Sequence, residues 1–181
     1  FCDALSRSSV AYDLVLDLGL TAERLRRYEL VFLPTCACLS DATVALLREY
    51  VSAGGRIVGS FDTSLYAADG TRRDEFALAD VLGVSWLGSE TAYHTWNYFA
   101  PVAAHSLYDG LDIPYWPAPA VGLDVAARAG ATVLARYHAP MAGRYDPLTP
   151  LDKPAVVLNT FGRGTSLYLA GTFAEMCREF N

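Results

Sequence analysis

Short apolar runs separated by polar links predict an alternation of strands and helices in the first half of the chain. Residues 12–18 (YDLVLDL) predict an apolar strand, and residues 29–34 (ELVFLP) predict a second one. The second run is apolar without interruption, which favours burial on both faces and therefore parallel pairing. Residues 3–10 indicate the end of an amphipathic helix, and residues 21–28 indicate a short helical turn between the two strands.

The clearest helix is predicted for residues 40–55 (SDATVALLREYVSAGG). Ser40 or Asp41 is suited to cap its first turn, and Gly54 or Gly55 supplies a left-handed stop. Its apolar residues share one face at helical spacing: Val44, Leu47 and Val51. This pattern indicates a helix that buries one side.

Two further elements follow this helix. Residues 56–61 (RIVGSF) predict a third strand, and residues 74–83 (DEFALADVLG) predict another helix with Gly83 as its C-cap. Strands that alternate with helices over short links are typical of a doubly wound sheet, because parallel strands need crossover connections. We therefore expect an α/β fold with a mainly parallel sheet.

The second half of the chain has alternating runs but no convincing long helix between them. Four such runs predict strands: residues 90–99, 132–138, 154–161 and 165–173. The last two flank Gly162 to Gly164, a tight connection that predicts a β-hairpin. Proline-rich and turn-rich loops are expected at residues 113–121 and 138–154. We therefore expect antiparallel strands added to one side of the parallel sheet.

The beginning of the sequence departs from the usual order of an open α/β domain. Such a domain normally starts with a strand, whereas this sequence opens inside a helix. One interpretation is that the first strand lies upstream and that residues 1–181 form a single domain cut from a larger protein. The other is a domain that simply begins with a helix.

Composition limits the classes of partner. The chain has 181 residues, of which 52% are hydrophobic and 19% charged, as in an ordinary globular domain. The formal net charge is -6, and no basic run is longer than a pair of arginines. Nucleic acids and anionic membranes are therefore not expected partners. No run of about 18 apolar residues and no signal-peptide pattern is present, so a cytoplasmic location is expected.

Four cysteines occur at scattered positions: Cys2, Cys36, Cys38 and Cys177. They are too few for a disulfide scaffold in a chain of this length, which favours a reducing compartment. Cys36 and Cys38 form a C-x-C pair, but a structural zinc site needs four ligands and no second pair lies at a suitable spacing. We therefore expect neither a metal nor a cofactor.

The polar loop after residues 56–61 is the place where many α/β hydrolases keep their nucleophile. Phe61, the last residue of the predicted strand, has no reactive atom, while Ser60 before it and Ser64 after it carry hydroxyls. A serine nucleophile needs a base, and three histidines are available: His94, His105 and His138. No motif marks any of them, so a hydrolase that uses Ser60 or Ser64 stays a minor alternative.

Aromatic residues are the other feature that indicates function. Five of them are candidates for a subunit interface or a sugar contact: Tyr93, Trp96, Tyr98, Tyr115 and Trp116. Flat rings with polar edges suit sugar stacking and interfaces alike, and they also suit a core. In a strand, Trp96 and Tyr98 share one face while Tyr93 and Phe99 share the other, so one face is expected to be core.

Several motifs in succession resemble a known family: YELVFLP, SDATVALLREYVSAGGRIVGSF, FALADVLGVSW and KPAVVLNTFGRGTSLYLAGTF. Over about residues 12–173 the chain resembles the middle domain of glycoside hydrolase family 42 β-galactosidases, the β-galactosidase trimerisation domain. The resemblance implies a flavodoxin-like three-layer sandwich, similar to class I glutamine amidotransferases. Those enzymes carry a cysteine at the position that Phe61 occupies here, so the resemblance also implies that this nucleophile is lost. Cys36 and Cys38 follow the preceding strand and do not replace it.

The role implied by this resemblance is accessory. In these β-galactosidases the domain sits beside a catalytic TIM barrel, packs between the subunits of a homotrimer and helps to wall off a neighbouring substrate pocket. The two glycosidase carboxylates belong to the barrel, so no catalytic residue is assigned here. Two alternatives stay open: an amidotransferase-like α/β hydrolase, and a carbohydrate-binding module that uses the aromatic loop.

Overall fold

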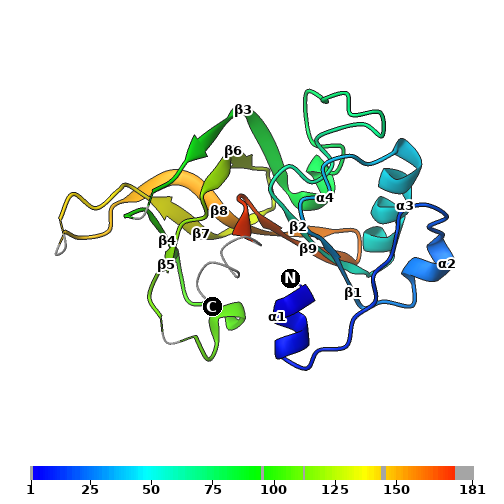
Figure 1. The fold of residues 1–181 in the computed structure, drawn as a ribbon, viewed down its shortest axis with the longest axis horizontal. Helices are drawn as coiled ribbons and strands as arrows, with labels where there is room; N and C mark the ends of the chain where they lie inside the picture. The colour runs from blue at the N-terminus through cyan, green and yellow to red at the C-terminus, as the bar shows by residue number, and fades with distance from the viewer. Residues whose placement is uncertain (1, 95, 112, 144–145, 174–181) are drawn as a thin grey trace.

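The computed structural model describes residues 2–94, 96–111, 113–143 and 146–173 (Figure 1). Its helices are α1 (Cys2–Arg7), α2 (Ala22–Leu25), α3 (Asp41–Ser52), α4 (Ala79–Leu82) and the short 3-10 turn η1 (Ser106–Tyr108). Its strands are β1 (Leu30–Leu33), β2 (Arg56–Ser60), β3 (Val84–Ala92), β4 (Tyr98–Pro101), β5 (Trp116–Pro117), β6 (Val121–Ala127), β7 (Thr132–His138), β8 (Pro150–Phe161) and β9 (Gly164–Leu169).

A mixed sheet of seven strands, in the order β1-β2-β9-β8-β7-β4-β5, organises the fold. The pairs β1–β2 and β2–β9 are parallel, and the other four pairs are antiparallel. The sheet is therefore mixed, and the expectation of a mainly parallel sheet is wrong. The cause is the hairpin connection in the second half: β8 turns directly into β9 and pairs with it as predicted, with Phe161 opposite Gly164. Strands β3 and β6 form a separate antiparallel pair.

Helix α3 forms as its pattern predicts. The Ser40 side chain accepts a hydrogen bond from the Thr43 N–H at 3.1 Å and so caps the first turn. The predicted apolar face is buried in the structure: Val44, Leu47 and Val51. The helix ends at Ser52, and Gly54 follows with a φ of 113°. Because this helix crosses from β1 to β2, those two strands run parallel.

Helix α4 is shorter than the predicted helix at residues 74–83. The N–H groups before it are used by other acceptors: the Glu75 carboxylate accepts from Phe76 at 2.9 Å, and Ser64 Oγ accepts from Leu78 at 3.1 Å. These contacts hold the backbone in turns, so only Ala79–Leu82 is helical. Gly83 caps the helix in the left-handed conformation, as predicted.

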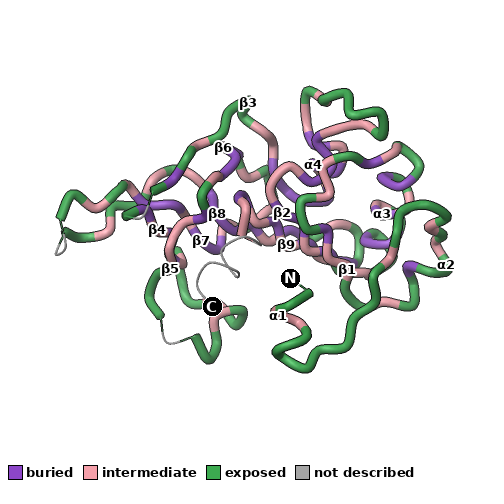
Figure 2. Tube along the Cα trace, viewed as in Figure 1, coloured by how far each residue is buried: buried purple, intermediate pink, exposed green. Residues whose placement is uncertain are grey.

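The core lies on the face of the sheet that α3 and α4 cover (Figure 2). On this face Ile57 of β2 and Tyr168 of β9 are buried. Asn159 Nδ2 donates to the Val81 carbonyl at 2.9 Å and Ser166 Oγ donates to the same oxygen at 2.6 Å, which ties the end of α4 to β8 and β9. The side-chain donors of Asn159 and Ser166 are therefore satisfied by a carbonyl group near the end of α4.

Residues 12–18 do not form the predicted strand. They are assigned no regular structure, and Leu14 and Leu16 are 76% and 74% exposed. Strand β1 is correspondingly less buried than predicted: it lies at the edge of the sheet, Leu30 is exposed and only Leu33 is buried. An apolar run predicts a buried strand only when both neighbours are present, and among the described residues β2 is the strand that pairs with β1.

The predicted run at residues 90–99 is divided between two sheets. Its start belongs to β3 and its end to β4, with a turn between them in which the Asn97 N–H donates to the His94 carbonyl at 2.9 Å. The prediction that one face of this run is core is nevertheless seen in the burial of its aromatic residues. Tyr93 and Phe99 are buried, whereas Trp96 is 55% exposed.

Candidate functional site

The carboxyl end of β2 keeps the backbone geometry of a nucleophile turn. Phe61 follows the strand with a left-handed φ of 49°. Its N–H donates to the Leu169 carbonyl at 2.9 Å, and its carbonyl accepts from the Tyr168 hydroxyl at 2.7 Å. Hydrogen bonds on both sides thus hold a strained residue where a hydrolase would expose its reactive atom. The side chain at this position is a phenyl ring.

The two serines beside Phe61 are part of the scaffold. Both are buried, and Ser60 Oγ accepts from the Thr35 N–H while Ser64 Oγ accepts from the Leu78 N–H, each at 3.1 Å. Within the described residues neither hydroxyl is hydrogen-bonded to a histidine. The two side chains therefore connect β2 to the loop after β1 and to the start of α4.

The loop after β1 is joined tightly to the same turn. Thr63 Oγ1 accepts from the Cys36 N–H at 3.2 Å, and the Ser64 N–H donates to the Cys36 carbonyl at 2.9 Å. Thr35 and Ser64 also have left-handed φ values, of 55° and 69°. Three strained residues including Phe61 therefore lie in one hydrogen-bonded region, a common feature of present or former active sites.

The Cys36 thiol is not activated in this region. Burial raises its pKa, and the charges of Asp17 and Asp62 raise it further, so the thiol stays protonated at neutral pH. Burial also raises the pKa of Asp62, whose Oδ1 has no hydrogen-bond partner among the described residues. A protonated thiol beside carboxylates lacks the positive surroundings that make a cysteine nucleophilic.

The three histidines lie in the other half of the chain, on separate segments. His94 begins the turn between β3 and β4, and His105 Nδ1 accepts from the Leu107 N–H at 3.2 Å before η1. His138 ends β7, where burial lowers its pKa. In the described part of the chain no group of three or more His, Cys, Asp or Glu side chains is arranged to hold a metal ion.

A surface with exposed aromatic rings lies on β4, on the turn before β4 and on the loop that precedes β5. Trp96 is 55% exposed, Tyr115 is 38% exposed and Tyr98 is half-buried. The rings of Tyr98 and Tyr115 meet edge to face, with centroids 5.0 Å apart and an interplanar angle of 76°. These three of the five predicted site residues are accessible to a partner.

The other two predicted site residues pack against rings inside the chain. Tyr93 is 8% exposed and stacks on Tyr137 with centroids 4.4 Å apart. Trp116 lies between Phe99 and Tyr108, at centroid distances of 5.5 and 5.7 Å. The rings of Tyr93 and Trp116 are therefore engaged by other rings of the same chain, and the contact of Trp116 with Phe99 joins β5 to β4.

Sequence reasoning missed the aliphatic part of the surface. Four side chains between β4 and β5 are about half exposed: Val102, Leu107, Leu111 and Ile113. Together with Trp96, Tyr98 and Tyr115 they define what we call the 96–115 surface, in a segment that is largely exposed (Figure 2). The only signal in the sequence was apolar residues within a stretch that has neither strand nor helix periodicity.

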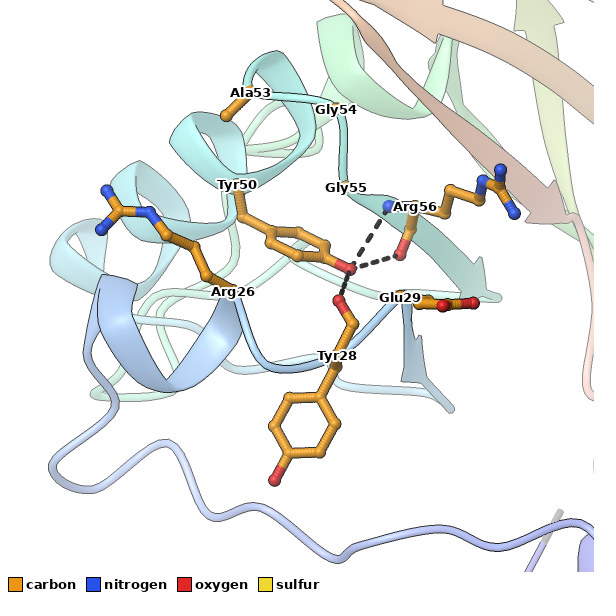
Figure 3. A pocket seen from close by; sticks show the side chains of 8 residues that line it. All are labelled: Arg26, Tyr28, Glu29, Tyr50, Ala53, Gly54, Gly55 and Arg56. Atoms are coloured by element: carbon orange, nitrogen blue, oxygen red, sulfur yellow. Dashed lines mark hydrogen bonds between the residues drawn. The ribbon is translucent and has the colours of Figure 1, made fainter.

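A cavity of about 370 Å³ lies at the other end of the molecule, between the ends of α2 and α3 and the start of β2 (Figure 3). The Tyr50 hydroxyl points into it, donates to the Tyr28 carbonyl at 2.9 Å and accepts from the Arg56 N–H at 3.3 Å. Arg26 at its rim pairs with Glu49 at 3.1 Å. Because the central hydroxyl is used by backbone groups, the cavity is a structural junction.

The class of protein follows from these observations. The chain is an α/β domain with a mixed seven-stranded sheet, a small antiparallel pair beside it and a strained turn at the end of its second parallel strand. None of the helices in the described part has the length and apolar character that a membrane span requires. The family model of the β-galactosidase trimerisation domain matches residues 3–178, and the chain belongs to that family.

Solved structures with the same fold agree with this assignment. The β-galactosidase from Bacillus circulans sp. alkalophilus is 20% identical with a TM-score of 0.63, and the match covers 86% of this chain and 23% of that one. The cold-adapted β-galactosidase from Rahnella sp. R3 is 23% identical with a TM-score of 0.64, and the match covers 84% of this chain and 23% of that one. A cytoplasmic protein from Salmonella typhimurium is 14% identical with a TM-score of 0.67, and the match covers 94% of this chain and 73% of that one. The chain thus spans less than a quarter of the length of these β-galactosidases. No curated protein matches the sequence.

Proposed function

We propose that this chain is a non-catalytic oligomerisation domain of a β-galactosidase-like glycoside hydrolase, and that its 96–115 surface contacts another subunit. The observation that carries the proposal is the concentration of exposed apolar side chains. In the part of the chain that the structure describes, thirteen large hydrophobic residues are exposed, and six of them lie in the segment from Trp96 to Tyr115, both included. Contiguous exposed apolar surface rimmed by polar residues marks interaction sites, because its burial removes apolar area from water.

The chemistry at the end of β2 supports a non-catalytic role. A hydrolase or amidotransferase would need a nucleophile at the left-handed position and a base within hydrogen-bond reach. Phe61 supplies neither, and Ser60 and Ser64 already accept backbone hydrogen bonds. None of these residues can therefore serve as the nucleophile of an amidotransferase-like enzyme.

The assembly that we propose is a homotrimer in which the domain adjoins a TIM-barrel catalytic domain of the same polypeptide. The name of the family supports self-association, and the fraction of each β-galactosidase that the chain matches supports a larger parent protein. In such an assembly the 96–115 surface would also form part of the wall of a neighbouring substrate pocket. The location proposed is the cytoplasm, where free thiols such as Cys36 and Cys38 stay reduced.

The fold of the domain is proposed to be the flavodoxin-like three-layer sandwich of class I glutamine amidotransferases. Two features support it: the parallel order β1-β2-β9, with α3 crossing between β1 and β2, and the left-handed residue that follows β2. In that arrangement Phe61 stands where the amidotransferase cysteine would be.

The test of the contact surface is the mass of the assembly. Trp96→Ala should shift the protein toward a smaller species in light scattering at micromolar concentration, since exposed aromatic anchors contribute most to interfaces. Leu87→Ala is the matched control, because Leu87 is 60% exposed on β3, outside the surface. Circular dichroism of both variants should equal that of the parent. An unchanged mass for Trp96→Ala in the full polypeptide would refute the interface.

Direct carbohydrate contact is the second candidate for the same surface. Trp96 and Tyr115 have exposed rings of the kind that sugars stack on. The neighbouring Leu107, Leu111 and Ile113 offer no hydrogen bonds to hydroxyl groups, which favours a protein partner. Calorimetric titration with galactosides separates the two functions: heat of binding that Trp96→Ala abolishes would support sugar contact, and no heat at millimolar ligand would exclude it.

A further inference from the structure

His138, the last residue of β7, has a buried imidazole ring with one nitrogen left unpaired. The residue is 8% exposed, and its Nδ1 atom is buried and has no hydrogen-bond partner among the described residues. A neutral imidazole leaves this nitrogen as an acceptor, whereas protonation places an N–H and a positive charge on the ring. Because burial of an unpaired charge is unfavourable, the folded chain favours the neutral ring.

The backbone that follows His138 is held on both sides. On one side the Ala139 N–H donates to the Thr149 carbonyl at 2.9 Å, which continues the pairing of β7 with β8. On the other side the Met141 N–H donates to the Trp96 carbonyl at 3.1 Å. Figure 1 shows this part of the chain, in yellow, leaving the sheet beyond the ends of β4 and β7. His138 therefore lies at the base of the segment that holds the backbone of Trp96.

The register of the sheet also places His138 beside Tyr98. Strands β4 and β7 are antiparallel with Phe99 opposite Tyr137, so the next position along the two strands brings Tyr98 opposite His138. Side chains that are directly opposite in an antiparallel pair lie on the same face, with Cβ atoms about 5 Å apart. His138 thus lies next to one ring of the 96–115 surface and three residues before the contact that fixes another, Trp96.

The carboxylates around His138 in the described part of the chain do not compensate a charge on its ring. The segments next to it carry the following titratable side chains: His94, Tyr98, Arg136, Asp146, Asp152 and Lys153. Arg136 pairs with Asp152, and Lys153 pairs with Asp124. The Asp152 side chain is 97% exposed, so it belongs to the solvent side of its strand. A proton on the buried ring therefore has no carboxylate partner among the described residues.

We propose that His138 makes the 96–115 surface sensitive to pH: the neutral ring keeps the segment after β7 in place against Trp96, and protonation of the ring in mild acid releases that segment. Burial lowers the pKa of His138, and a hydrogen bond to the Leu148 backbone opposes this without cancelling it. A histidine in the released segment titrates near its ordinary value, about 6.5. As the pH falls below that value the released form binds more protons than the closed form, so the closed form loses stability in acid and keeps it at neutral pH.

Hydrogen exchange of backbone amides at pH 7.5 and pH 5.0 tests the proposal, with each rate corrected for the intrinsic effect of pH on exchange. We expect the protection of the Ala139 and Met141 amides to fall at least about 3-fold at pH 5.0, because the released form gains the proton. Amides of β9, which lies two strands away from β7, are the internal control and should keep their protection. Equal protection of Met141 at the two pH values would overturn the proposal.

His138→Gln separates the ring from other groups that titrate in acid. Glutamine stays neutral, so in this variant the protection of Met141 should be the same at pH 7.5 and pH 5.0. His94→Gln is the matched control, because His94 is exposed in the turn before β4, and it should keep the change seen in the parent. Should His138→Gln fail to fold, NMR titration of the parent decides: the Met141 amide shift should follow the titration of the His138 ring, and unrelated titrations would overturn the proposal.

The consequence for assembly rests on the proposed function of the 96–115 surface. In the full polypeptide, light scattering should give a smaller mass for the parent at pH 5.0 than at pH 7.5, and an unchanged mass for His138→Gln. A mass that does not change with pH while the protection of Met141 does would refute the surface as a subunit contact and support the role of His138. An equal loss of mass in the parent and in His138→Gln would overturn the role of His138 in assembly.

Discussion

The Tyr93 ring stacks on the Tyr137 ring with centroids 4.4 Å apart and an interplanar angle of 25°. Tyr93 follows β3 and Tyr137 lies in β7, so the contact joins the small β3–β6 pair to the main sheet. Gly122 of β6 makes room for it, since a Cβ there would lie 2.8 Å from the Tyr93 ring. An aromatic residue of a predicted interface thus connects the two sheets.

The first prediction concerns this stack. Tyr93→Ala should lower the free energy of unfolding by about 3 kcal/mol, because it leaves a cavity beside a fully buried ring. Tyr98→Ala, in the half-buried ring of the 96–115 surface, should cost less than about 1 kcal/mol in a monomeric preparation. Urea denaturation followed by tryptophan fluorescence measures both. A smaller loss for Tyr93→Ala than for Tyr98→Ala would show that the stack does not hold the two sheets together.

The second prediction concerns the approach of α3 to the hairpin between β8 and β9. A Cβ on Gly164 would lie 2.2 Å from the backbone oxygens of both Val51 and Gly55. Backbone atoms cannot rotate away, so Gly164→Ala should cost at least about 2 kcal/mol or prevent folding. Gly143→Ala is the matched control, because a Cβ there makes ordinary contacts of 3.5 Å or more. Thermal unfolding measures the difference, and equal midpoints for the two variants would disprove the close approach.

The third prediction concerns pH and the Asp124 carboxylate. Burial by itself raises the pKa of Asp124, but hydrogen bonds from Lys153, Ser89 and Thr91 together outweigh burial and leave the pKa below its usual range. Lys153 Nζ lies 2.7 Å from Asp124 Oδ1. A lowered pKa in the folded state stabilises the protein above the pKa of the unfolded chain, about 3.9, and the stabilisation is lost as the pH falls through the folded value.

Asp124→Asn should therefore be less stable than the parent at pH 7, by about 2 kcal/mol, and the difference should shrink below pH 4. Urea denaturation between pH 7 and pH 3 gives the difference. Asp152→Asn is the control, since the Asp152 side chain is 97% exposed and its ion pair with Arg136 contributes little. A constant difference between Asp124→Asn and the parent over this range would show that the charge of Asp124 is not the stabilising feature.

The sequence by itself determined those elements whose stability is local. Helix α3 was predicted because Ser40 caps it and its apolar residues repeat at helical spacing, and both features act within the helix. The hairpin at Gly162 follows in the same way from a turn of two residues between alternating runs. The phenyl ring at position 61 was also evident, because the strand before it and the loop after it define the position.

The tertiary structure decided what depends on distant partners. Residues 12–18 have the pattern of a strand but pair with no other segment among the described residues, and a strand exists only where another chain segment takes its hydrogen bonds. The N–H groups before α4 are taken by Glu75 and by Ser64, which lies far from them in sequence, so the helix is shortened. The 96–115 surface is exposed because no described element packs over it, and an apolar loop residue has no periodicity from which its burial can be inferred.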